Sequence, residues 1–207
     1  MSGKFITFEG ADGVGKTTQV KLLQDYLEKS GIAVITTREP GGDDFSEGIR
    51  NILKSNFNID SITETLLLFA ARREHFLKNI KPNLDKNIWV LCDRFYDSTL
   101  VYQGKLKNVS IEQIMNLKQF TIDDFEPDAT IVLDLDFSSS QSHITSRSLT
   151  RDSYDMMEQE KYQIIQNGFR KISEIFSDRC SLVRATGSKL TVAKKIIKAL
   201  RKKDWFK

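Results

Sequence analysis

Eight residues near the start of the chain have the types and the spacing of a phosphate-binding loop. Residues 10–17 read GADGVGKT and fit the pattern G-x-x-x-x-G-K-[ST], between an apolar run and an amphipathic segment. Glycines let successive backbone N–H groups turn toward a phosphate, and the N-terminus of the following helix adds partial positive charge. We therefore expect a nucleoside triphosphate to be bound by Gly10, Ala11, Asp12, Gly13, Val14, Gly15, Lys16, Thr17 and Thr18.

Two side chains of this loop have expected chemical roles. Lys16 would reach the terminal phosphates and offset their charge during phosphoryl transfer, and the hydroxyl of Thr17 would hold Mg²⁺. Proteins that use such a loop with guanine nucleotides commonly carry an N-K-x-D segment, which the sequence lacks. The sequence therefore favours a kinase-like domain that uses ATP over a GTPase switch, although the loop alone does not name the acceptor.

Two further charged pairs directly follow strand-like segments. Arg38 and Glu39 precede Pro40, and Asp93 and Arg94 follow the apolar run 88–92. Ligands of open α/β sheets bind at the carboxyl ends of the strands, where an acid can hold a metal and an arginine can bind two phosphate oxygens. The alternatives are a surface ion pair for Arg38 and Glu39 and a buried structural salt bridge for Asp93 and Arg94.

The elements that must position these residues alternate along the chain. Helical patterns, among them segments at 63–78 and 110–120, separate five short apolar runs, at 5–8, 33–35, 88–92, 131–135 and 181–183. This order predicts an α/β protein, a three-layer fold of the P-loop NTPase class with a central, mainly parallel five-stranded sheet flanked by helices. We expect a single domain over residues 1–207, with the polar segment at about 138–157 as a mobile lid.

Composition limits the classes of partner. The chain has 31 basic and 28 acidic side chains, and a net charge of +3 gives no support for nucleic-acid binding. No apolar run approaches the roughly 20 residues needed to cross a membrane. Two cysteines and the lack of an apolar signal segment before the first predicted strand indicate a cytoplasmic protein with reduced thiols.

Several segments together resemble the thymidylate kinase family. They read FEGADGVGKTTQ at 8–19, TREPGG at 37–42, AARREH at 70–75 and DRFYDSTLVYQG at 93–104, with weaker similarity in EPDATIVLDLD at 126–136 and RATG at 184–187. The resemblance implies phosphorylation of dTMP to dTDP with Mg·ATP, and a homodimer. Rival hypotheses are a kinase for dUMP or a deoxynucleoside, and a nucleotide-binding regulator without catalysis.

The resemblance also implies residue roles around the acceptor. Asp12 would hold the 3′-hydroxyl, Arg38 the acceptor phosphate, Glu39 would orient that phosphate or the metal, and Tyr102 would crowd C2′ of the sugar. Asp93 would hold the metal and Arg94 a phosphate. Thr99 and Gln103 lie four residues apart, so on a helix they share one face, and the amide offers both a donor and an acceptor to a pyrimidine.

The stacking partner of the base is ambiguous. The family spacing Phe-x-x-x-Arg places the arginine at Arg73 when it is anchored on Phe69, but at Arg72, with Leu68 in place of the aromatic residue, when it is anchored on the downstream Arg-Glu-His. We favour Arg72 as the contact to the base and keep Phe69 as a shifted stacking partner.

The predicted lid supplies the remaining catalytic candidates. Arg147 and Arg151 could swing over the transferred phosphoryl group, since the loop has Gly13 where some family members have an arginine. The segment departs from the family after the lid, where Asp-Arg-x-Glu is replaced by DMME at 155–158. A solvated loop is the alternative for these arginines, and Asp134 is either a metal-side acid or an ion-pair partner within the fold.

Overall fold

Five parallel strands form the centre of the molecule. The computed structural model describes residues 3–55, 57–145, 158–203 and 205. The strands are β1 (Phe5–Glu9), β2 (Val34–Arg38), β3 (Trp89–Asp93), β4 (Ala129–Asp134) and β5 (Cys180–Arg184), in the order β2-β3-β1-β4-β5. Every pairing is parallel. All five predicted runs are strands, and the predicted fold class is confirmed.

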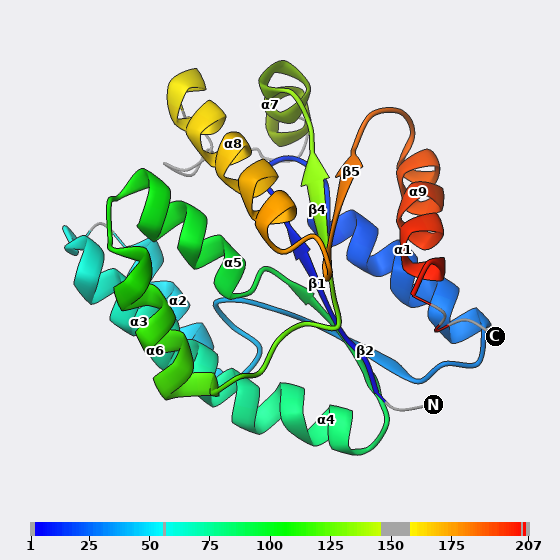
Figure 1. Cartoon of the computed structure of the whole chain (residues 1–207), viewed down its shortest axis with the longest axis horizontal. Helices are drawn as coiled ribbons and strands as arrows, with labels where there is room; N and C mark the ends of the chain where they lie inside the picture. Colours follow the sequence, from blue (N-terminus) through cyan, green and yellow to red (C-terminus); the bar gives the residue numbers. More distant parts are fainter. Residues whose placement is uncertain (1–2, 56, 146–157, 204, 206–207) are drawn as a thin grey trace.

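Helices cover both faces of this sheet, which gives the three layers (Figure 1). The helices α1 (Lys16–Lys29) and α9 (Lys189–Arg201) pack together on one face. The other helical segments are α2 (Asp44–Lys54), α3 (Ser61–His75), the π-helical η1 (Phe76–Ile80), α4 (Lys81–Asp85), α5 (Tyr96–Thr99), the π-helical η2 (Leu100–Leu106), α6 (Ile111–Ile122), α7 (Phe137–Thr145) and α8 (Gln159–Ile175). None of the helices in the described ranges has the length and apolar character that crossing a bilayer requires.

The segment expected to be a polar surface excursion is in part regular. Residues 137–145 form α7, which begins where the Asp136 carboxylate accepts hydrogen bonds from the Ser139 backbone N–H and from the Ser138 and Ser139 hydroxyls. Serine-rich composition suggested a loop, but a capping aspartate before such a segment satisfies the free N–H groups of a helix start. The rest of the predicted lid, residues 146–157, lies outside the described residues.

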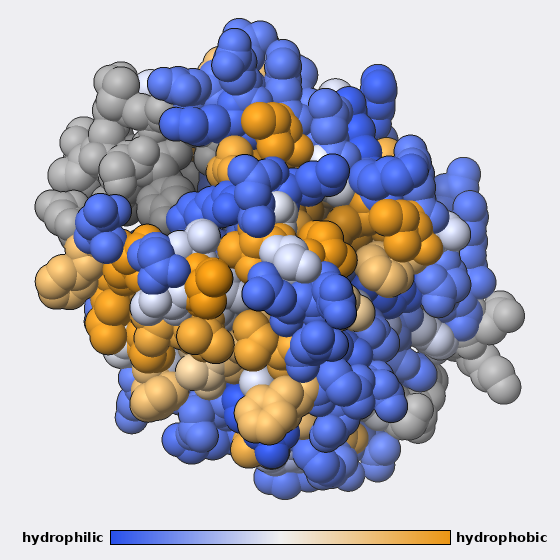
Figure 2. Space-filling model, turned by 60° about the vertical axis from the view of Figure 1, so that its left-hand side comes forward, coloured by the Kyte–Doolittle hydropathy of each residue, from blue (hydrophilic) through white to orange (hydrophobic). Residues whose placement is uncertain are grey.

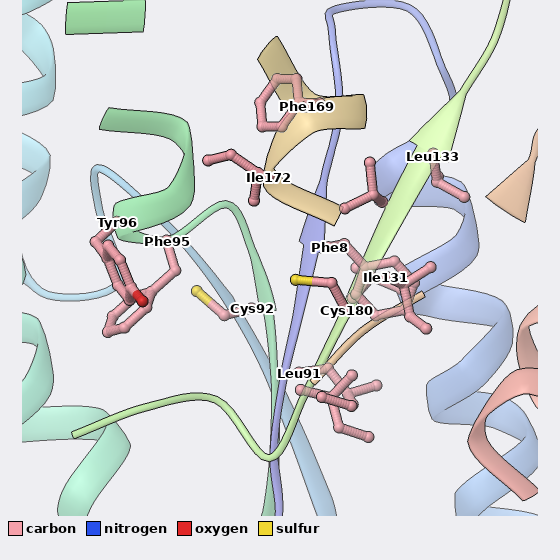
Figure 3. Close-up of a cluster of buried hydrophobic side chains, with 14 of the residues drawn as sticks. Phe8, Leu91, Cys92, Phe95, Tyr96, Ile131, Leu133, Phe169, Ile172 and Cys180 are labelled. Atoms are coloured by element: carbon pink, nitrogen blue, oxygen red, sulfur yellow. The ribbon is translucent and has the colours of Figure 1, made fainter. Parts of the chain in front are cut away.

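The core fixes the strands from both sides. All residues of β1 and β4 are buried, because central strands of a parallel sheet are covered on both faces. Figure 3 shows Phe8, Leu91 and Ile131 of three neighbouring strands on one face of the sheet, while Cys92 and Cys180 point to the other face, toward Ile172 of α8. The result is a rigid platform for the loops that follow the strands.

The pairing register brings the predicted site residues to one edge. Asp93 at the end of β3 is paired with Phe8 of β1 and with Arg38 of β2. The phosphate-binding loop and the pairs Arg38–Glu39 and Asp93–Arg94 therefore leave the sheet side by side, at its carboxyl edge.

Candidate active site

The phosphate-binding loop turns on three glycines with positive φ. Gly10, Gly13 and Gly15 have φ of +134°, +79° and +96°, values that side-chain-bearing residues rarely adopt. A Cβ at Gly10 would lie 2.5 Å from the carbonyl oxygen of Leu133. The loop closes directly onto α1, for which Gly15 is the N-cap residue, so the free N–H groups of the helix start face the site.

Lys16 is folded back against the loop. Its Nζ donates to the carbonyl oxygens of Gly10 at 3.1 Å and Ala11 at 2.9 Å. Burial, and after it the nearby cation of Arg94, lowers the pKa of Lys16 to about 8. A bound polyphosphate would favour the charged form, so this lysine is suited to an anion that arrives from solvent.

Thr17 and Asp93 form an oxygen pair beside this lysine. The Thr17 hydroxyl donates to Oδ2 of Asp93 at 2.7 Å. Mg²⁺ keeps several waters and takes only one or two protein oxygens together with substrate phosphates, so a hydroxyl and a carboxylate at a phosphate site fit it. Within the described ranges, no group of three or more His, Cys, Asp or Glu residues could hold a metal. A divalent ion held by this hydroxyl and this carboxylate would take its other ligands from substrate phosphates and water.

Arg94 connects both sides of the site. Its Nη1 donates to the carbonyl oxygen of Gly10 at 3.1 Å and to the Ser98 hydroxyl at 3.0 Å. Its Nη2 donates to Oδ1 of Asp12 at 2.6 Å and to the Tyr102 hydroxyl at 3.3 Å. The backbone of Arg94 is left-handed, with φ of +73°. The surrounding contacts fix this cation between the loop and η2.

These contacts control the ionisation of Asp12. Burial favours the neutral acid, but the charges of Arg94 and Lys16 outweigh it and hold the pKa of Asp12 at about 2. The Tyr102 hydroxyl donates to Oδ2 of the same carboxylate at 3.3 Å, and burial raises the pKa of this tyrosine. At neutral pH, Asp12 is an anionic acceptor directed at the cleft beside a neutral phenol.

At the end of β2, Glu39 holds an arginine from α3. Its Oε2 accepts from Arg72 Nε at 2.7 Å, and its Oε1 lies 3.0 Å from His75 Nδ1. Arg72 Nη2 donates to the Thr99 hydroxyl at 3.2 Å. Among the described residues, the buried Nη1 of Arg72 has no hydrogen-bond partner. Glu39 thus orients Arg72 and leaves one of its donors available.

Two other predicted contacts are paired with acids. Gln103 is buried and donates from Nε2 to Oε1 of Glu64 at 3.3 Å, and Glu64 also pairs with Lys107. The exposed Arg38 donates to Oε1 of Glu47 at 2.8 Å.

One open cleft of ≈ 1080 Å³ collects these groups. The predicted site residues that line it are Asp12, Gly13, Gly15, Lys16, Thr17, Arg38, Glu39, Arg72, Asp93, Arg94, Thr99, Tyr102 and Gln103. It extends from the phosphate-binding loop to Arg72, with Arg94 between them. A cleft of this volume, with donors at both ends, fits two nucleotides whose phosphates meet.

Comparison with known proteins gives the family. The thymidylate kinase family model matches residues 8–196. Thymidylate kinases from Rhodopseudomonas palustris (strain TIE-1) and Ruthia magnifica are 39% and 42% identical, over 97% and 89% of this chain and 90% of each relative. A crystal structure of thymidylate kinase from Ehrlichia chaffeensis superposes with a TM-score of 0.81 at 36% identity, covering 97% of this chain and 100% of that one. The chain belongs to the thymidylate kinase family.

The two candidates for base stacking occupy different positions in this thymidylate kinase family member. Leu68 lines the cleft. Phe69 is 1% exposed, and its ring lies under the guanidinium of Arg72. The distance between the ring centroid of Phe69 and Cζ of Arg72 is 4.7 Å. Arg73 is outside the cleft lining and donates to the carbonyl oxygen of Thr121 at 2.6 Å. Arg72 and Leu68 therefore face the cleft, while Phe69 supports Arg72 from the core.

Among the described residues, several others predicted for the site are not part of the cleft lining or form a different contact. Ala11 and Val14 are buried in the core, so they can offer only backbone groups to a ligand, and Thr18 is not part of the cleft lining. Asp134 forms an ion pair with Arg170, with 3.0 Å between Asp134 Oδ2 and Arg170 Nη2. This agrees with the second of the two alternatives for Asp134, an ion-pair partner within the fold. The predicted catalytic arginines Arg147 and Arg151 lie outside the described residues.

Sequence reasoning missed the contribution of α2. Glu47 and Arg50 line the cleft from this helix, and Arg50 Nη1 donates to the carbonyl oxygen of Pro40 at 2.9 Å. Burial, and after it repulsion from Arg38, lowers the pKa of Arg50. Glu47 and Arg50 lie three residues apart on a strongly amphipathic segment, and that spacing was the available signal.

Proposed function

We propose that this chain transfers the γ-phosphoryl group of Mg·ATP to dTMP and forms dTDP and ADP in a single in-line step. The phosphate oxygen of dTMP is itself the nucleophile, so the reaction needs positioning and charge neutralisation more than a general base. The observation that carries the proposal is the cleft itself. It has a phosphate-binding loop at one end, an available buried arginine donor at the other, and Arg94 between them.

In this proposal the loop and Lys16 bind the phosphates of ATP. Thr17 and Asp93 hold the magnesium ion, which neutralises phosphate charge when it is bound. Arg94 contacts the phosphoryl group in transfer, because it already reaches the loop through Gly10 and the acceptor side through Asp12. Arg147 and Arg151 remain proposed contributors from the lid.

On the acceptor side, Arg38 binds the phosphate of dTMP and Asp12 accepts a hydrogen bond from the 3′-hydroxyl. Tyr102 packs against the sugar, and its ring lies 5.1 Å from the Arg94 guanidinium. Arg72 donates from its unpaired Nη1 to the pyrimidine, which Thr99 and Gln103 flank. Leu68 supplies an apolar contact to the base where an aromatic ring was expected.

The direct test is ADP release from Mg·ATP with dTMP, dUMP, dCMP, dGMP and thymidine as acceptors. We expect dTMP to be the best substrate, and Lys16→Ala to abolish turnover. Equal rates with thymidine would contradict the proposed phosphate contact of Arg38. If the chain binds ATP but phosphorylates none of these acceptors, the proposed kinase activity is refuted and a nucleotide-binding protein without catalysis is the remaining hypothesis.

We also propose that the chain is a homodimer. Exposed apolar side chains gather on the side of the molecule where α3 and α6 lie (Figure 2). Ile62 and Leu66 follow each other at one-turn spacing on α3 with exposed fractions of 52% and 49%, and Phe120 of α6 is 84% exposed. Apolar area of this kind is costly in water and is typical of a protein interface.

Light scattering tests the dimer. Leu66→Glu is expected to give a monomer, because the interface would then bury an unpaired charge. Leu190→Glu is the matched control, since Leu190 is similarly exposed, at 58%, but lies on α9 on the opposite face of the sheet. A wild-type monomer at micromolar concentration would refute the proposal.

We further infer a cytoplasmic location, where the buried free thiols of Cys92 and Cys180 stay reduced.

A further inference from the structure

Helix α7 is hydrogen-bonded to the phosphate-binding loop. It lies at the carboxyl end of the sheet, beside the tip of β4 (Figure 1). Ser140 is fully buried and donates from Oγ to the carbonyl oxygen of Asp12 at 2.5 Å. His143 donates from Nδ1 to the carbonyl oxygen of Gly13 at 3.0 Å. One helix thus holds two consecutive carbonyl groups of the loop.

The contact leaves no space between helix and loop. A Cβ at Gly13 would lie 2.5 Å from Oγ and 2.6 Å from the carbonyl oxygen of Ser140, and 3.0 Å from Cγ1 of Ile144. Any side chain at position 13 would force α7 away from the loop. The glycine is therefore required by the approach of α7 as well as by its positive φ.

Helix α7 is held in place independently of the loop. The Asp136 carboxylate accepts from the Ser139 N–H at 2.9 Å at its start, and Phe137 packs on Tyr162 of α8 with ring centroids 5.3 Å apart. The helix is thus attached to the end of β4 and to α8. Loss of one hydrogen bond to the loop would free the loop without displacing the helix.

In a trans peptide, the carbonyl group and the following N–H group point in opposite directions. Carbonyl groups of Asp12 and Gly13 that are held toward α7 therefore turn the N–H groups of Gly13 and Val14 away from it, toward the phosphate side of the loop. We propose that Ser140 and His143 are positioning residues that orient these two N–H groups for the phosphates of ATP. This inference rests on the proposed ATP site.

The test compares variants that remove and keep each donor. Ser140→Ala and His143→Ala each remove the hydrogen bond to the loop, whereas His143→Asn can place an amide donor where Nδ1 lies. Ser142→Ala is the matched control, because Ser142 is on the same helix and, among the described residues, donates to the carbonyl oxygen of Ser138 within that helix and not to the loop. For each variant, calorimetry gives the Kd of Mg·ADP, kinetics give separate KM values for ATP and dTMP, and thermal unfolding gives Tm.

We expect Ser140→Ala and His143→Ala each to raise the Kd of Mg·ADP and the KM of ATP by about two- to tenfold, the effect of one hydrogen bond. The KM of dTMP and the Tm should stay near wild type, His143→Asn should recover most of the affinity, and Ser142→Ala should match wild type. Unchanged nucleotide affinity in both alanine variants would overturn this inference but not the proposed ATP site. An equal rise in the KM of ATP and the KM of dTMP would do the same. A wild-type chain that binds no Mg·ADP would overturn the ATP site and this inference together.

Discussion

Replacement of Arg94 by lysine tests whether the geometry of this cation, rather than its charge, drives phosphoryl transfer. The guanidinium donates to Gly10, Ser98, Asp12 and Tyr102 at once, from two nitrogens. Lysine keeps the positive charge but offers a single nitrogen at the end of a flexible chain. Arg94→Lys therefore removes the proposed two-point contact to a phosphate and weakens the hold on Asp12.

The magnitude follows from the number of bonds lost. A hydrogen bond to a charged group contributes about 1.5–3 kcal/mol, and the substitution costs one such bond to the phosphate and one to Asp12. The expected loss of about 3–6 kcal/mol corresponds to a decrease of roughly 10²- to 10⁴-fold in kcat/KM for dTMP. Most of it should appear in kcat, because the contact to the transferred group strengthens in the transition state.

Steady-state ADP release at saturating Mg·ATP measures this effect, with circular dichroism to verify the fold. Arg73→Lys is the matched control, since it makes the same substitution at an arginine that is outside the cleft and donates to the Thr121 carbonyl oxygen. A kcat/KM for Arg94→Lys within about fivefold of wild type would refute the argument, because two charge-assisted hydrogen bonds cannot be lost at so small a cost. An equal loss in Arg73→Lys would show that the substitution itself is disruptive.

Three further predictions concern burial and specificity. Arg72→Met should lower the free energy of unfolding by about 3–5 kcal/mol in urea denaturation, because Glu39 loses its buried partner, and adding Glu39→Gln should recover part of it. Burial and then repulsion from Asp97 raise the pKa of Glu9 from 4.5 to about 8, so its contribution to stability is complete below pH 4.5 and is lost as the pH rises through 8. The Tm of Glu9→Gln relative to wild type should therefore increase from about pH 5 to about pH 9, and a constant difference would contradict the burial argument. Kinetics should show a preference for dTMP over dUMP of roughly 10- to 200-fold in kcat/KM, since a methyl group in an apolar pocket contributes only about 1–3 kcal/mol; a preference above about 10⁴-fold would require a polar contact that discriminates.

The proposed base-binding end of the cleft shows where spacing along the chain no longer predicts which side chains line the site. A four-residue spacing placed Thr99 and Gln103 on one helical face, and both line the cleft although α5 passes into the π-helical η2 between them. The same kind of argument could not choose between Phe69 and Leu68. These neighbours differ by one helical position, and only the packing of α3 decides which one enters the core.

The sequence by itself determined the elements that depend on local pattern. Apolar runs specified the strands, since each run is short and lies between helical segments. The glycine spacing at 10–17 specified a phosphate-binding loop, because few functions other than phosphate binding require this spacing. Charged pairs after the strands were predictable because parallel strands end at a common edge. These signals are contiguous in the chain, so no knowledge of distant contacts is needed to recognise them.

Tertiary structure alone decided which distant groups share a hydrogen bond. Glu39 holds Arg72 from 33 positions away, and Ser140 holds the Asp12 carbonyl from 128 positions away. Such contacts depend on the order of the strands and on how each helix is rotated about its axis, and a rotation by one residue moves a side chain from the cleft to the core. The sequence therefore identifies the chemical groups, while the packing of helices on the sheet determines which of them meet.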